Sequence, residues 1–318
     1  MNFVEFTAGN DDNDRRLDKV LRKLCSDQSL SQIYKAIRKG LVKVNDKKCS
    51  ETTKILSGDK IKLADFLITP EKPLSKKASL AHLMPAVIFQ NDDLIIVNKP
   101  YGLKSQPNSS NDLSMDKILL DFYRENFTSN SISFTPAPLH RLDKNTTGLL
   151  VCSLSLKGAR WFCENINSHL IEKKYLGIMK GKLNEQQIWE DKISKNEEAA
   201  GFKTISAEHT ENESNCWTKI TPIDYGKYKD EDVTLIEFHI KTGKHHQIRA
   251  QASLHKCPLL GDTAYGTEKT DLKQEYYLHA YKLVLKENPL NLPPEITCKP
   301  SDDFMLALKT CGIKKIEV

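Results

Sequence analysis

From residue 86 onward, short apolar runs alternate with clusters of turn-forming residues. These runs lie at residues 87–89, 94–97, 149–152 and 235–240. Runs of this length between tight turns are typical of strands in an antiparallel sheet, whereas helical stretches are fewer, at about 114–126 and 155–166. We therefore predict an α+β fold for residues 86–318: a mixed, mostly antiparallel β-sheet with peripheral helices.

One acidic residue stands out within this region. Asp143 lies in the nine-residue segment 140–148, among turn formers and between the apolar runs 136–139 and 149–151. A loop presented by a rigid sheet is a common place for a catalytic group. An Asp in a Thr- and Gly-rich turn is also a common cap or Asx-turn residue, so neighbouring motifs have to decide between the two interpretations.

Composition sets broad limits on the chain. Its 318 residues, 39% hydrophobic and 28% charged, can bury a sizeable core and suggest two domains. No signal-peptide pattern and no stretch of membrane-spanning length occurs, so we expect neither secretion nor membrane insertion. The eight cysteines form no Cys-x-x-Cys pair. We expect reduced thiols in the cytoplasm and neither a metal nor a cofactor.

The positive charge is concentrated in one short segment. Residues 1–14 carry a net charge of −4, residues 15–62 carry +9, and the remainder sums to zero. Within residues 15–62, apolar residues at helical spacing predict a first helix around Leu17 to Leu24 and a second one capped by Ser31 and ended by Gly40. An alternating strand with an Asn-Asp turn follows, and residues 60–63 form a later strand.

This segment resembles the RNA-binding module shared by a small-subunit ribosomal protein and tyrosyl-tRNA synthetases. The expected phosphate contacts are Arg15, Lys19 and Arg22 on the first helix, Lys35, Arg38 and Lys39 on the second, and Lys43 on the strand. The alternative is an ordinary solvated helix face. We assign residues 1–64 to this module, 65–85 to a proline-containing linker, and 86–318 to a catalytic domain.

Several motifs in the catalytic domain occur in the order known from one enzyme family. They are His140-Arg141-Leu142-Asp143 with Thr146 to Val151, Asn98 to Leu103, Lys174-Tyr175-Leu176 with Gly181, Thr242 to Arg249, Leu259 to Asp262 with Tyr265-Gly266, and Leu278-His279-Ala280. Together they resemble the RluA-type pseudouridine synthases, which convert uridine in RNA into its carbon-linked isomer. The resemblance covers most of residues 86–285.

Six residues within these motifs receive candidate roles, most of them implied by the resemblance. Asp143 matches the catalytic aspartate, and Arg249 matches the arginine that pairs with it and keeps it ionised. Tyr175 would stack on the everted uracil, although core packing is an equal alternative. Arg141 would fill the space that the uridine leaves, or only contact a phosphate. Ile248 and Leu278 would form an apolar wall, unless they are ordinary core residues.

The chain departs from the family pattern at three positions. Lys244 and His245 stand where Arg and Thr are usual, and Gln106 stands where a His is common. His245, His246 and His279 could suggest a metal site, but neighbouring residues on a strand point to opposite faces, which argues against one.

We therefore expect an RNA uridine isomerase that acts on large-subunit ribosomal RNA, with tRNA as the less favoured substrate, and that works as a monomer. A binding protein or assembly factor that keeps the fold without activity is the main alternative. A kinase is a poorer one, because no Gly-rich phosphate loop is present.

Overall fold

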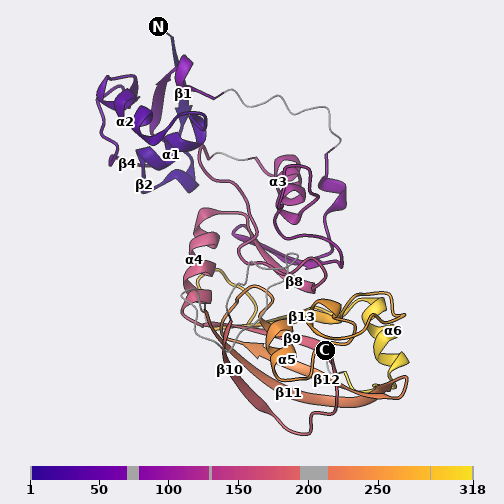
Figure 1. Cartoon of the computed structure of the whole chain (residues 1–318). Coiled ribbons are helices and arrows are strands. Elements are labelled where there is room, and N and C mark those ends of the chain that lie inside the picture. Colours follow the sequence, from indigo (N-terminus) through magenta and orange to yellow (C-terminus); the bar gives the residue numbers. More distant parts are fainter. Residues whose placement is uncertain (1, 70–78, 129–130, 194–213, 287, 317–318) are drawn as a thin grey trace. The chain divides into compact units, whose positions relative to one another are not determined.

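The computed structural model describes residues 2–69, 79–128, 131–193, 214–286 and 288–316 (Figure 1). The chain divides into two compact units. Unit 1 comprises Met1–Leu83, Lys117–Ala137 and Leu154–Lys157, and unit 2 comprises Met84–Asp116, Pro138–Ser153 and Gly158–Val318. Of the expected linker, residues 70–78 lie outside the described residues. Two 3₁₀ turns, η2 (Asp65–Leu67) and η3 (Ala81–Leu83), lie on either side of them.

Unit 1 contains a three-stranded antiparallel sheet and two short helices. The strands are β1 (Phe3–Thr7), β5 (Lys60–Ala64) and β3 (Val42–Val44) in that order, with η1 (Asn10–Asp12) and the pair β2 (Arg15–Arg16) and β4 (Lys54–Ile55) beside them. Helices α1 (Leu17–Leu24) and α2 (Leu30–Arg38) bury the apolar residues whose spacing predicted them. The edge strand β1 was not expected, because most of its side chains are exposed and no apolar alternation marks it.

The expected N-cap of the second helix was wrong by two residues. Ser29, not Ser31, caps α2: its Oγ accepts from the Gln32 N–H at 3.3 Å, and the Gln32 side chain accepts from the Ser29 N–H at 2.7 Å. This reciprocal pair is a capping box, in which a polar residue follows the cap by three positions. Ser29 and Gln32 have that spacing, whereas Ser31 is followed three residues later by Tyr34.

Unit 1 also includes residues well beyond the predicted module. The buried Asp12 carboxylate accepts hydrogen bonds from the Gly9 N–H at 2.9 Å, the Ile132 N–H at 2.8 Å and the Ser133 N–H at 3.0 Å. These backbone N–H groups bind a charged acceptor, the buried Asp12 carboxylate. Charge-assisted hydrogen bonds therefore attach the segment around Ile132 to the N-terminal residues.

Unit 2 is built on one large sheet, which confirms the predicted α+β class with a mostly antiparallel sheet. In the described residues it has nine strands, in the order β10-β11-β12-β9-β13-β8-β7-β6, with β14 paired to β13; only β8 and β13 are parallel. Their bounds are β6 Val87–Gln90, β7 Leu94–Lys99, β8 Thr147–Ser153, β9 Ile171–Lys180, β10 Gln187–Ile193, β11 Ser214–Tyr228, β12 Glu231–Ile240, β13 Leu278–Leu285 and β14 Glu295–Thr297.

The helices follow the expected pattern. Helices α3 (Met115–Asn126) and α4 (Leu156–Asn167) confirm the two predicted helical stretches, and their residues are divided between the two units. Unit 2 also contains α5 (Gln247–Leu254), η4 (Thr263–Tyr265) and α6 (Asp302–Thr310). Among the described residues, no helix combines the length and the apolar character needed to cross a bilayer.

The centre of the sheet positions the loop that carries Asp143. Every residue of β8 is buried, which explains why residues 149–152 form a continuous apolar run rather than an alternating pattern. At its start, Gly148 has φ +107°, and a Cβ there would lie 2.2 Å from the Ala280 carbonyl oxygen of β13. Only glycine permits this approach, so the strand begins at a fixed place four residues after Asp143.

Candidate active site

The loop that carries Asp143 is attached to the segment that follows β7. The Leu142 N–H donates to Ser105 Oγ at 3.0 Å, and that hydroxyl donates to the Leu142 carbonyl at 2.9 Å. On the other side of Asp143, the Lys99 ammonium donates to the carbonyl of Lys144 at 3.1 Å. Backbone bonds on both sides of the acid therefore fix its position before any substrate arrives.

Lys99 is a fully buried cation. Its ammonium also donates to the carbonyls of Pro100, at 2.9 Å, and Leu103, at 2.8 Å, so all three of its protons have acceptors. Burial lowers the pKa of Lys99 to about 7, although the charge of Asp143 acts in the opposite direction.

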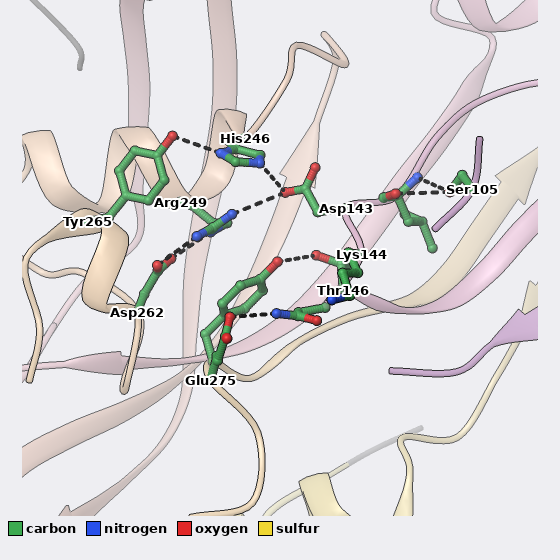
Figure 2. A network of polar contacts seen from close by, with 12 residues as sticks. Ser105, Asp143, Lys144, Thr146, His246, Arg249, Asp262, Tyr265 and Glu275 are labelled. Atoms are coloured by element: carbon green, nitrogen blue, oxygen red, sulfur yellow. Dashed lines mark hydrogen bonds and ion pairs between the residues drawn. The ribbon is translucent and has the colours of Figure 1, made fainter. Parts of the chain in front are cut away.

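Arg249, on α5, forms the second part of the site. Its Nε and Nη2 donate to the two carboxylate oxygens of Asp262, both at 2.7 Å, and its Nη1 lies 3.8 Å from Asp143 Oδ2 (Figure 2). The two parallel bonds to Asp262 fix the plane of the guanidinium, which leaves Nη1 directed at Asp143.

Two aromatic rings pack against the same guanidinium. Its Cζ atom lies 4.8 Å from the ring centroid of Tyr265 and 4.3 Å from that of Tyr276. Burial disfavours the charge of Arg249, but Asp262, Tyr276 and Asp143 outweigh it and raise the pKa further above its ordinary value. Arg249 is thus a permanently charged group held in one orientation.

The Asp143 carboxylate is more basic than an ordinary aspartate. Burial raises its pKa, while Arg249, Arg141 and Lys99 lower it and Asp262 raises it; the net shift is upward. A raised pKa suits a group that has to accept a proton or form a bond to carbon near neutral pH.

His245 and His246 lie in a turn before α5, not on a strand. His246 has φ +55°, and the two rings stack with centroids 3.8 Å apart, so the argument from strand alternation was wrong. His246 Nδ1 is 2.9 Å from the Tyr265 hydroxyl, and its Nε2 is 3.7 Å from Asp143 Oδ2.

These two histidines and Asp143 offer metal-ligand atoms within 4.8 Å of one another. The guanidinium beside the same carboxylate opposes a cation there. His279 is not part of this group: it is buried between Thr147 Oγ1 at 2.8 Å and the Cys298 carbonyl at 3.0 Å.

All six residues that the resemblance suggested for the site line one pocket of unit 2, of about 400 Å³. They are Arg141, Asp143, Tyr175, Ile248, Arg249 and Leu278. Tyr175, Ile248 and Leu278 are buried, whereas Arg141 is exposed. Burial first, and then the charge of Asp143, raises the pKa of the Tyr175 hydroxyl, so it stays protonated. The pocket therefore combines a basic carboxylate, an apolar wall and a neutral phenol.

The seven cations expected to bind RNA differ in their surroundings. Lys19 and Arg22 on α1, Lys35 and Arg38 on α2, and Lys39 at the C-cap of α2 are exposed. Arg15 precedes α1 and lies on β2, so placing it on the first helix was wrong; its Nη1 donates to Ser133 Oγ at 2.7 Å. Lys43 is half-buried, with its ammonium 5.6 Å from the ring centroid of Phe3.

Sequence reasoning missed several contributors to the site. Asp262, Tyr265 and Lys99 belong to motifs that it named, but it gave them no role, and it overlooked Tyr276 and Lys173 entirely. The signal for Asp262 was its position in the Leu-Leu-Gly-Asp motif, since an invariably charged arginine in a pocket needs a carboxylate partner. Nothing in the sequence indicated that Tyr276 would pack on that arginine.

Known proteins resemble both parts of the chain. Residues 93–254 match the RNA pseudouridylate synthase family, and residues 15–61 match the S4 domain. Ribosomal large subunit pseudouridine synthase C of Rickettsia bellii (strain RML369-C) is 31% identical over 86% of this chain and 90% of its own length. The homologue from Rickettsia felis (strain ATCC VR-1525 / URRWXCal2) is 30% identical over 91% of this chain and 96% of its own.

Among solved structures, human RNA pseudouridylate synthase domain containing 4 has a similar fold. It matches with a TM-score of 0.60 and 21% sequence identity, over 75% of this chain and 97% of its own.

Proposed function

The chain belongs to the RNA pseudouridylate synthase family, isomerases that convert uridine to pseudouridine in RNA, and we propose that Asp143 is its catalytic carboxylate. The observation that carries this proposal is the position of that carboxylate. It lines a pocket, it is held from both sides by backbone hydrogen bonds, and it lies 3.8 Å from a guanidinium whose orientation is fixed by Asp262.

The isomerisation needs few chemical groups. The bond from ribose C1′ to uracil N1 breaks, the ring turns, and C5 joins C1′; the proton on C5 is lost and N1 gains one. Asp143 acts on the ribose, either by attack at C1′ or by accepting a ribose proton. Arg249 keeps it ionised, and Tyr175 packs on the detached ring while it turns.

The remaining pocket residues receive the everted nucleotide. A uridine paired in a stem must leave its stack to reach Asp143. Arg141, which is exposed, takes the space that the uridine vacates, and Ile248 and Leu278 form the apolar wall beside the base.

Large-subunit ribosomal RNA is the proposed substrate, with tRNA second. The names of the Rickettsia relatives support ribosomal RNA as the substrate. The five exposed cations on α1, on α2 and at the C-cap of α2 support RNA contacts beyond the reacting base. No ion pair joins any of these five to a carboxylate within the part of the chain that the structure describes, so they are available to phosphates. Residues 1–64 serve as the RNA-binding module, 65–85 as the linker and 86–318 as the catalytic domain.

The protein acts as a monomer in the cytoplasm. One chain supplies every group of the pocket, so the chemistry requires no second copy. The eight cysteines are free thiols, which is the state expected in a reducing compartment.

Mapping of pseudouridines in a strain that lacks this chain tests the proposed function. We expect one or more uridines of large-subunit ribosomal RNA to lose their modification, and the wild-type gene to restore it. Loss confined to tRNA would contradict the proposed substrate. Complete modification of both RNAs in the deletion strain would contradict the activity itself.

A further inference from the structure

Lys173 is a buried cation that lines the same pocket but has no part in the mechanism above. It lies on β9 two residues before Tyr175, so both side chains leave the same face of the sheet, roughly 7 Å apart along the strand. Its relative exposure is only 7%. The next residue, Lys174, points to the opposite face, where its ammonium is 3.4 Å from Glu237 Oε1.

Within the described ranges of the chain, no carboxylate compensates the charge of Lys173. Among the same residues, neither a hydrogen bond nor an ion pair joins its ammonium to any other group. Burial lowers its pKa to about 8, which leaves it mostly charged at neutral pH. Most of the side chain is buried, and Nζ is not among the fully buried polar atoms, so the ammonium is open to the pocket that Lys173 lines. A charge that is largely desolvated and has no partner in the described part of the chain costs free energy, which indicates an anionic ligand at this place.

A glycine lies close to the ammonium of Lys173, and Asp143 is the one carboxylate among the described residues that line the pocket. Gly243 lies beside the ammonium: a Cβ at that position would be 3.2 Å from Lys173 Nζ. His140, on the same side of the pocket, accepts the Val151 N–H through Nε2 at 3.1 Å. Burial, together with the charge of Lys173, lowers its pKa to about 3, so this ring is neutral. Lys241 and Lys244 are exposed on the loop that contains Gly243 and also line the pocket.

We infer that Lys173 forms an anion subsite and pairs with an RNA backbone phosphate next to the target uridine. This inference rests on the proposed function, because it assumes that the target nucleotide occupies the pocket with its base against Tyr175. A lysine binds phosphate as a compact point charge, and RNA is the anion that this enzyme family handles. A uracil carbonyl is the other possible acceptor, but being neutral it would leave the charge of Lys173 uncompensated.

The test measures RNA affinity against salt concentration for the full chain in an Asp143→Asn background, which prevents turnover during the measurement. The variants are Lys173→Met, which keeps the length of the side chain without its charge, Lys173→Arg, which keeps the charge, and Lys174→Met as the matched control. The ligand is a uridine-containing stem–loop from large-subunit ribosomal RNA.

We expect Lys173→Met to reduce the slope of log affinity against log salt by about 0.7 to 0.9 and to weaken binding about tenfold or more at low salt. Lys173→Arg should retain most of the slope, and Lys174→Met should leave it unchanged. Thermal unfolding of Lys173→Met should occur no lower than that of wild type, because the variant removes a largely desolvated charge that has no partner among the described residues.

Equal slopes for Lys173→Met and Lys174→Met would overturn the inference. A lower melting temperature with an unchanged slope would show a structural role instead, and slower single-turnover conversion with an unchanged slope would show contact with the base. Turnover of the protein with the native Asp143 is measured separately. If the protein with the native Asp143 makes no pseudouridine but Lys173→Met still reduces the salt dependence of RNA binding, the proposed function is wrong and the anion subsite is supported.

Discussion

Replacing Asp262 with Asn should lower both the stability of the protein and the rate of the reaction, because Asp262 fixes the orientation of Arg249. The Asp262 side chain is 1% exposed and that of Arg249 is 8% exposed, and two bonds of 2.7 Å join them. Removal of one partner from a buried ion pair costs about 3–5 kcal/mol of unfolding free energy. For a unit of this size, each kcal/mol lowers the melting temperature by about 2–4 °C, so we expect a decrease of about 6–20 °C.

The same substitution should slow the reaction. Asn can accept only one of the two hydrogen bonds and carries no charge, so the guanidinium is held less firmly between the rings of Tyr265 and Tyr276, and Nη1 is less firmly directed at Asp143. Misplacement of a catalytic partner by about 1 Å can cost about 10²-fold in rate. Single-turnover conversion of a saturating stem–loop, measured below the melting temperature of the variant, gives this loss.

Two controls distinguish the effect of losing this ion pair from a nonspecific loss of stability. Lys273→Ala removes an exposed partner of Asp303 and should change stability by less than about 0.5 kcal/mol. The double variant Arg249→Met/Asp262→Asn should be less destabilised than the sum of its two single variants, because neither member of this ion pair then remains as a buried group without the other. Additive destabilisation, or an Asp262→Asn protein that is as stable and as active as wild type, would refute the reasoning.

Two further predictions concern charge. Arg249 lowers the pKa of Asp143, so Arg249→Met should raise that pKa and move the acidic limb of the rate–pH profile, where the carboxylate becomes protonated, to higher pH; an unmoved limb in single-turnover profiles would contradict the pairing. Neutralising Lys35, Arg38 and Lys39 together with Gln should reduce the salt slope of RNA binding by up to about 0.9 for each phosphate that these side chains bind in the wild-type protein. The rate at saturating RNA should change little, and a large decrease of that rate with an intact slope would count against a binding role for α2.

The sequence indicated the fold well where burial produces a local pattern. The apolar runs that became β7 and β8 and the stretches that became α3 and α4 were predicted, because a buried strand or an amphipathic helix imposes its own periodicity. The edge strand β1 was not predicted, because its partner β5 is more than fifty residues away and its side chains are mostly exposed. The order of the strands in each sheet was not predictable from local patterns either, because it depends on pairing between residues that are far apart in the sequence.

The sequence motifs predicted which residues belong to the candidate site but not how those residues are arranged. Collinear motifs identified Asp143 and Arg249, but the geometry between them depends on contacts that no spacing reveals. Asp262 binds Arg249 from a separate turn of the chain. His246 has a left-handed backbone conformation, which places it beside His245, whereas two neighbouring residues on a strand would point to opposite faces. Lys173 was missed because one lysine in a Lys-Lys pair is buried and the other is ion-paired, and composition cannot tell them apart.

The most direct test of the account is the single-turnover rate of Asp143→Asn on the mapped ribosomal stem–loop, with enzyme in excess and binding verified independently. Asn keeps the size of the side chain but can neither accept a proton as a carboxylate does nor form the same bond to carbon. We expect RNA affinity close to that of wild type and a rate lower by about 10²-fold or more. Formation of pseudouridine at the wild-type rate would contradict this expectation.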